Sequence, residues 1–133
     1  KRVTWSNVAT IKPIDPLTIY LEYTYGHEEN ITASLRDGTW QGWGAIGSYN
    51  WSDRFNTALR GEIFKDSDGV RSGLSRDVTL GEITLTGSYK FTKMLIGRAE
   101  LRQDWADQRF YKKGRTGADK NQTTIGVQAI YTF

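Results

Sequence analysis

Residues 78–107 read VTLGEITLTGSYKFTKMLIGRAELRQDWAD, and this stretch decides the fold class. On both sides of a short break in its middle, apolar and polar side chains alternate with a period of two. In the first half, Ile83 and Leu85 fall on one face and Glu82 and Thr84 on the other. Such alternation is typical of a β-strand with one apolar face. The stretch therefore predicts two antiparallel strands joined by a tight turn.

Five further segments show the same alternation, and none has the period of an amphipathic helix. They are residues 2–12, 17–26, 40–51, 55–66 and 123–133. In the first of them the facing of the side chains is ambiguous. Together with the two strands above, these segments predict an all-β chain of about seven strands.

The links between the segments alternate strictly between short and long. Short links lie at 14–16, 52–54 and 92–93, and long polar links at 27–39, 65–77 and 106–121. Since successive links of an antiparallel meander lie at opposite ends, all short turns are expected at one end, as in outer-membrane barrels. Segments of about 10 to 14 residues are long enough to cross a hydrocarbon core when tilted. Because only helices and closed barrels satisfy their backbone groups in lipid, we predict an antiparallel up-and-down transmembrane β-barrel meander.

The two faces of the predicted strands differ in a way that indicates which one meets lipid. The apolar face contains Gly47, Gly61, Gly81, Gly87 and Gly97. In a close-packed protein core these glycines would leave voids, whereas mobile lipid tails fill such gaps. The opposite face is predicted to line a water-filled pore with Glu22, Arg60, Glu62, Glu82, Lys90, Arg98, Glu100, Arg102 and Asp104. A soluble ligand-binding β-barrel, whose apolar face points inward, is an alternative.

Aromatic side chains gather near the short turns, at the ends of the predicted strands. They are Tyr49, Trp51, Phe55, Tyr89, Phe91, Tyr131 and Phe133. Amphipathic rings form girdles at the membrane interfaces of outer-membrane barrels. These residues are therefore predicted to form one such girdle.

The composition excludes most other function classes. The 133 residues include no Cys and one His, which leaves almost no material for a disulfide scaffold, a zinc site or a Ser-His-Asp triad. A formal charge of +3 is too small to indicate nucleic-acid binding. We therefore expect no enzyme, no metal and no cofactor. Residues 1–133 are expected to form a single transmembrane β-barrel domain or the C-terminal segment of one.

Two motifs have better structural explanations than chemical ones. Gly42, Gly44 and Gly47 match a dinucleotide-binding pattern, but they continue a strand where that motif requires a helix. Asp66 and Asp68 resemble the start of a calcium loop, but no Glu occupies the closing position. An ordinary Asp-Gly turn is predicted there instead.

Charged clusters have similar explanations. Glu62 with Glu82, or Glu100 with Asp104, has the composition of an acid/base pair for glycoside hydrolysis. Arginines on the same face favour a mixed-charge wet lumen over a catalytic site. The last long link also holds a basic cluster, which consists of Lys112, Lys113, Arg115 and Lys120. A solvated loop is predicted, with contact to phosphates of surface glycolipid as the alternative.

Five runs of residues carry a resemblance to a known family. They are Trp40-Gln41-Gly42, Ala58-Leu59-Arg60-Gly61-Glu62, Asp66-Ser67-Asp68-Gly69-Val70-Arg71, Glu82-Ile83-Thr84-Leu85-Thr86 and Tyr89-Lys90-Phe91. In order and spacing they resemble the beta-barrel porin family of Gram-negative outer membranes described as OmpL-like. Tyr131 and Phe133 look like the C-terminal signal that the barrel-assembly machinery recognises. The resemblance implies passive diffusion of ions or small solutes without a cofactor, and a chain that corresponds to the C-terminal portion of a larger barrel.

These observations predict a porin-like protein in the outer membrane of a Gram-negative bacterium, whose charged interior admits ions or small polar solutes. An alternative is a structural sheath or scaffold that holds a partner, such as an electron-transfer protein, across the membrane. Since single-chain barrels have even strand counts from eight upward, about seven strands leave the barrel incomplete. The expected partners are outer-membrane lipid, the barrel-assembly machinery, and a missing N-terminal portion, further copies or a lumen-filling partner. No nucleic acid is expected.

Overall fold

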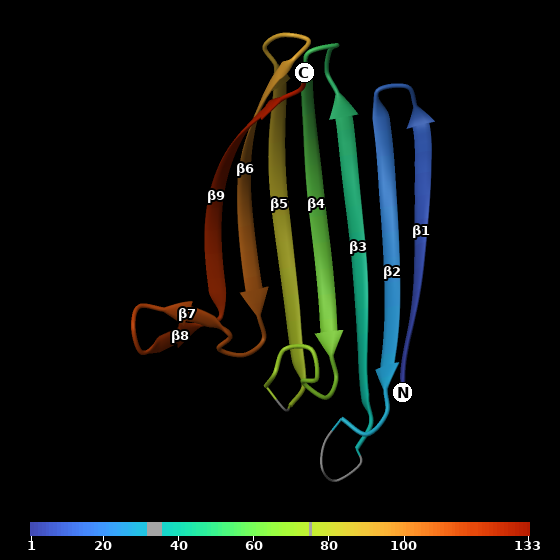
Figure 1. The fold of residues 1–133 in the computed structure, drawn as a ribbon, viewed down its shortest axis with the longest axis vertical. Helices are drawn as coiled ribbons and strands as arrows, with labels where there is room; N and C mark the ends of the chain where they lie inside the picture. The colour runs from blue at the N-terminus through green and yellow to red at the C-terminus, as the bar shows by residue number, and fades with distance from the viewer. Residues whose placement is uncertain (32–35, 75) are drawn as a thin grey trace.

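The computed structural model describes residues 1–31, 36–74 and 76–133, and no helix in these ranges is long and apolar enough to cross a membrane. Seven strands of the described chain form one antiparallel meander in the order β1-β2-β3-β4-β5-β6-β9 (Figure 1). Their bounds are β1 (Arg2–Ile14), β2 (Leu17–Glu28), β3 (Gly38–Asn50), β4 (Phe55–Asp66), β5 (Val78–Lys90), β6 (Leu95–Ala106) and β9 (Asn121–Tyr131). The predicted all-β meander is confirmed.

The links alternate in length as predicted, with the short turns at the upper end of Figure 1 and the long loops at the lower end. Side-chain hydroxyls fix two of the short turns. In the first, the Trp51 N–H donates to the Phe55 carbonyl (3.0 Å), and Ser52 Oγ accepts the Phe55 N–H (3.1 Å). In the second, Thr92 Oγ1 accepts the Leu95 N–H (3.0 Å). These local bonds favour the turn conformation over other backbone conformations, and they thereby hold successive strands in register.

A separate two-stranded hairpin was not expected from the sequence. It consists of β7 (Tyr111–Lys113) and β8 (Gly117–Asp119), lies within the last long link, and projects from the side of the main sheet (Figure 1). Strands of three residues are too short for an alternating pattern to stand out. The long link is therefore a structured projection.

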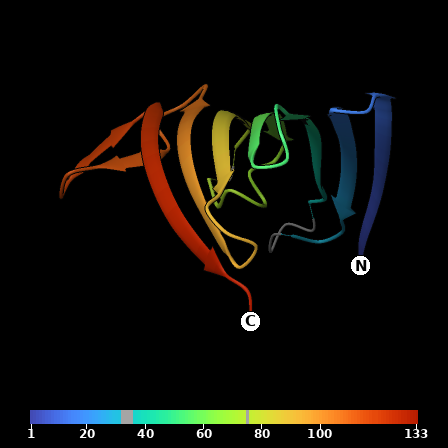
Figure 2. The same ribbon diagram turned by 90° about the horizontal axis from the view of Figure 1, so that it is seen from above.

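The main sheet is an open arc. Seen from above, β1 and β9 lie at the two ends of this arc, and the loop that follows β4 lies inside it (Figure 2). Among the described strands, β1 pairs only with β2, and β9 pairs only with β6. The sheet thus presents two edges whose outer backbone groups have no strand beside them.

The large apolar side chains are mostly exposed. Among the described residues, the buried apolar side chains are Trp40, Val78 and Ala106. One whole face instead exposes Trp5, Ile11, Leu21, Trp43, Leu59, Ile63, Ile83, Leu85, Leu101, Trp105, Ile125 and Val127. Soluble monomers rarely expose so continuous an apolar surface. This face therefore requires an apolar environment.

Strand β1 carries apolar residues on both faces, which explains why its pattern is ambiguous. Trp5 lies on the apolar face, where its ring meets the edge of Tyr23 at a centroid distance of 6.1 Å. Val8 lies opposite Glu22 on the polar face. The register also shifts between Ile11 and Ile14. A bulge of this kind changes which side chains share a face.

Candidate functional site

The strand register aligns acidic residues in one row across the polar face. Glu22 on β2 lies opposite Gly44 on β3, and Gly44 in turn lies opposite Glu62 on β4. Glu62 lies opposite Glu82 on β5, which lies opposite Asp104 on β6. Because side chains at paired positions share a face, four carboxylates from four strands point to the same side. We call this set the acidic row.

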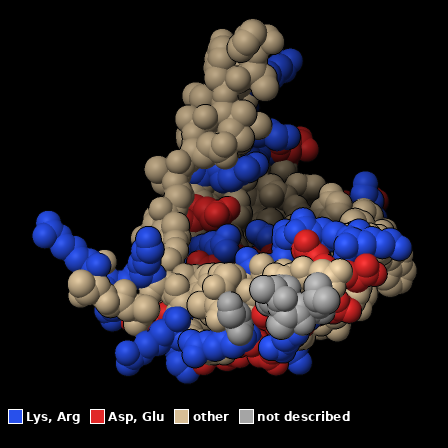
Figure 3. Space-filling model, turned by 60° about the horizontal axis from the view of Figure 1, so that its bottom comes forward, with Lys and Arg blue, Asp and Glu red and all other residues tan. Residues whose placement is uncertain are grey.

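Two arginines lie beside the acidic row. Arg60 and Arg102 both pair with Thr84, two positions along the strands from the row. Arg60 forms an ion pair with Glu62, and its Nε lies 3.2 Å from Glu82 Oε1. Figure 3 shows basic and acidic side chains together inside the hollow of the sheet. The polar face therefore carries an interleaved network of both charges.

Glu82 is the centre of this network. Its side chain is 5% exposed, and its Oε2 accepts the Thr84 hydroxyl at 2.5 Å and lies 3.5 Å from Arg102 Nε. Arg102 also binds Asp104, with Nη2 2.6 Å from Oδ1. Since isolated buried charges are strongly disfavoured, the contacts of Arg60 and Arg102 with Glu82 and Asp104 offset the cost of placing these carboxyl groups in the wall of the sheet.

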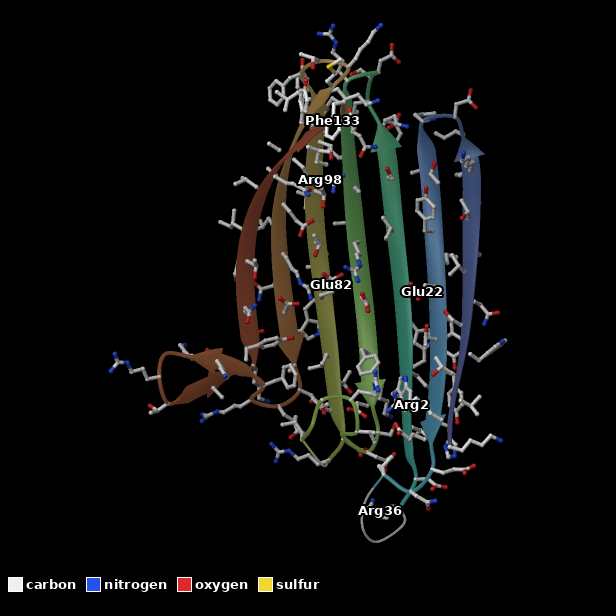
Figure 4. All side chains as sticks on the ribbon, viewed as in Figure 1. Arg2, Glu22, Arg36, Glu82, Arg98 and Phe133 are labelled. Atoms are coloured by element: carbon white, nitrogen blue, oxygen red, sulfur yellow. The ribbon has the colours of Figure 1, made fainter. Side chains whose placement is uncertain are left out.

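The other predicted pore-lining residues lie nearer the short turns on the same face. Glu100 accepts the Thr86 hydroxyl at 3.2 Å. Arg98 donates to Gln128 and to Ser88, both at 3.4 Å. Lys90 lies opposite Ile96, near the turn that joins β5 and β6. Figure 4 shows the labelled Glu82 and Arg98 at different heights along the sheet. All nine predicted residues therefore share one face, and their role in lining a pore stays a prediction.

A cavity of about 580 Å³ lies against the network. Besides the charged residues, it is lined by Phe110 and Tyr111 from the loop and hairpin before β9. The two rings meet at 88° with a centroid distance of 5.3 Å. Burial, followed by the nearby Asp104 carboxylate, raises the pKa of Tyr111, so its phenol stays neutral. The sequence did not indicate these two residues, because only tertiary folding brings the link to the sheet.

The predicted aromatic girdle is assembled at the short-turn end. Neighbouring rings contact each other, with centroid distances of 4.6 Å for Tyr49–Trp51 and 5.2 Å for Tyr89–Phe91. Phe133, labelled in Figure 4, lies at the same end of the sheet and is fully exposed. The remaining two members are Phe55 and Tyr131, which are exposed as well. Whether these rings sit at a membrane interface stays a prediction.

A second aromatic group, which the sequence did not indicate, lies on the apolar face toward the long loops. Tyr23 contacts both Trp5 (6.1 Å) and Trp43 (5.7 Å). Trp105 lies in the same row as Trp43 and covers Gly81, where any Cβ would collide with the indole. The sequence feature that could have revealed this group is the position of these aromatic residues on apolar faces next to the long links.

The short motifs have structural roles. Gly42 and Gly44 lie within β3 and pair with β2 and β4, so they form no phosphate-binding turn before a helix. The Asp66 carboxylate accepts backbone N–H groups of its own loop, and Gly69 has a φ of 67°. The turn interpretation of this segment therefore fits its geometry. In the described part of the chain, no three His, Cys, Asp or Glu residues are grouped to hold a metal ion.

Comparison with known proteins agrees with this architecture. No curated protein and no solved structure matched the chain. A family model described as "Putative beta-barrel porin-2, OmpL-like" matches residues 1–133. The matched range contains every strand of the meander. The chain therefore belongs to this beta-barrel porin family.

Proposed function

We propose that this chain forms part of the wall of a water-filled outer-membrane pore in a Gram-negative bacterium, through which ions or small polar solutes diffuse passively. The observation that carries the proposal is the separation of the two faces of one curved sheet. One face exposes large apolar side chains, and the other holds the charged network. A barrel wall between lipid and water needs this arrangement.

The spacing of the two aromatic groups supports a membrane-spanning wall. Phe91 lies ten positions after Gly81, the residue that Trp105 covers. At about 3.4 Å per residue and a strand tilt of about 40°, these ten positions span about 26 Å along the membrane normal. The apolar band of outer-membrane barrels is about 25 Å tall. The two groups are thus spaced as a pair of interfacial girdles would be.

Closure of the pore requires strands beyond the seven of this sheet. The outer edges of β1 and β9 lack partners among the described strands, and unpaired backbone groups are costly in lipid. Further strands of the same polypeptide or further copies would complete the barrel. The particle mass in detergent distinguishes these two sources.

Conductance in planar bilayers tests the proposal on the full-length protein. The wild type should give stepwise currents, and Arg98→Glu should shift the permeability ratio toward cations, because it reverses one exposed charge on the polar face. Val127→Ala is the matched control, since Val127 lies on the apolar face and is 85% exposed. Its ratio should match that of the wild type.

Absence of conductance from the full-length protein would contradict the pore, as would a ratio that Arg98→Glu leaves unchanged. A stoichiometric polypeptide that co-purifies and occupies the lumen would instead favour the sheath. The family match points to a barrel without enzymatic activity.

A further inference from the structure

We propose that the loop after β4 is a fixed constriction of this pore, and that Arg71 on this loop tunes ion preference. We call residues 67–74 the inward loop. The inference rests on the proposed pore function and adds an element that the strand pattern does not contain. It follows from three sets of contacts that hold the loop over the polar face.

Asp66 provides the first set of contacts. It is the last residue of β4, its side chain is fully buried, and its carboxylate accepts the N–H groups of Val70 (3.1 Å), Arg71 (2.9 Å) and Ser72 (2.8 Å). Hydrogen bonds to an ionised acceptor are roughly twice as strong as neutral ones. Three of them on one carboxylate fix the backbone of the inward loop relative to the strand.

Strand β3 provides the second set. Asp68 Oδ2 accepts the backbone N–H of Thr39 at 3.0 Å, and the Ser67 N–H donates to the Thr39 carbonyl at 3.0 Å. A methyl group of Val70 lies so close to Gly38 that any Cβ at this glycine would collide with it. The inward loop is therefore tied to β3 as well as to β4.

Trp40 provides the third contact and places Arg71. Trp40 lies on the polar face, is 5% exposed, and covers Gly26 on β2. The Arg71 guanidinium carbon lies 5.0 Å from the centroid of its ring, which is cation–π geometry. The indole thus holds a cation over the polar face near the long-loop end.

The position of Arg71 brings it near two carboxylates of the acidic row. A cavity of about 280 Å³ is lined by Arg71 and Trp40 together with Glu22 and Glu62. Figure 2 shows the loop between β4 and β5 inside the arc of the sheet. A loop fixed in this place occupies cross-section that water would otherwise fill. Its guanidinium also offsets negative charge in the solute path.

The size limit of the pore tests the constriction. Asp66→Asn replaces one acceptor oxygen by an N–H₂ group and removes the negative charge, so at least one of the three backbone donors loses its acceptor and the remaining bonds become weaker neutral ones. For the full-length protein with this substitution, we expect a larger single-channel conductance in planar bilayers. We also expect larger neutral sugars to enter vesicles faster. Asp77→Asn is the matched control, because it makes the same change at an exposed residue of the same link. It should leave both quantities unchanged.

The reversal potential under a salt gradient tests Arg71 without disturbing Asp66. Arg71→Gln should raise the cation-to-anion permeability ratio by a few fold at low ionic strength, since the acidic row loses a counter-charge, and less at high salt. Arg76→Gln removes the same charge from an exposed position in the same link and should have little effect.

The outcomes separate this inference from the pore itself. One outcome is that the wild type conducts and Arg98→Glu changes its permeability ratio, while Asp66→Asn and Arg71→Gln behave like their controls. This result would contradict the constriction and would leave the proposed pore function supported. A silent wild type would overturn both.

Discussion

Glu82 and Asp104 lie directly opposite each other on β5 and β6, and both side chains are nearly buried on the polar face. Like charges at paired positions destabilise a sheet unless a cation lies between them. Arg102 supplies this cation, because its guanidinium reaches both carboxylates. The charge network is therefore a structural feature of the wall as well as a candidate selectivity element.

Arg102→Gln should destabilise the sheet. The substitution leaves the nearly buried Asp104 carboxylate without a cation, and because the Arg102 side chain is 40% exposed, the cost should be about 2 kcal/mol, less than for a fully buried pair. Arg98→Gln is the matched control on the same strand and face, because Arg98 is exposed and bonds only neutral groups in the described structure; its effect should stay below about 1 kcal/mol. Urea unfolding from lipid vesicles measures both values. Equal stability of the two variants would contradict the role of Arg102.

Gly81→Val should destabilise the apolar face. The Trp105 indole lies on Gly81, so a side chain there displaces the ring and costs about 1 to 3 kcal/mol. Gly87→Val makes the same change on the same strand and face, where nothing lies within 4 Å of the added Cβ. Tryptophan fluorescence during unfolding should show a loss of stability for Gly81→Val and a neutral or stabilising effect for Gly87→Val. A loss of stability of similar size in both variants would show that the Trp105 indole does not cover Gly81.

Lys113 and Asp119 should give the projecting hairpin a pH-dependent contact. The Lys113 ammonium lies 2.7 Å from the Asp119 carboxylate, and this bond, with the Lys120 N–H, lowers the pKa of Asp119. For a lowered carboxylate pKa, the stabilisation is present at pH above the unfolded-state value and is lost as the pH falls through the folded-state value. NMR titration of the carboxyl carbon should therefore show a midpoint below the ordinary range of an aspartate.

Lys113→Gln should raise the pKa of Asp119 toward its ordinary value. Lys112→Gln is the control, since Lys112 is an exposed lysine on the same strand of the hairpin. Its titration curve should match that of the wild type. A curve that Lys113→Gln does not move would rule out the ion pair in solution.

The strands and links were predictable because their signal is local. Alternation over ten or more residues specifies a face, and short links such as the one at Ser52 contain their own hydrogen-bond acceptor. The shared face of residues such as Arg60 and Glu82 follows from the same alternation once the register is fixed.

The elements that the sequence missed depend on tertiary contacts. Arg71 gains its position from Trp40, a residue of another strand, and Asp66 alone gives no sign that it anchors three amides. The hairpin at β7 and β8 is too short to show a period. The facing of β1 was ambiguous because apolar side chains such as Val8 lie on its polar face.

Spin-label accessibility at neighbouring positions of β9 tests the central claim most directly, and since these 133 residues contain no cysteine, no other residue of the seven-stranded sheet takes up the label. Thr124 lies opposite Arg102 on the polar face, and Ile125 lies opposite Leu101 on the apolar face. For the full-length protein in lipid vesicles, a label at Thr124→Cys should collide with a water-soluble nickel chelate. A label at Ile125→Cys should collide with oxygen dissolved in the lipid. An Ile125→Cys label shielded from both reagents, as in a soluble core, or reached mainly by the nickel chelate would contradict the account.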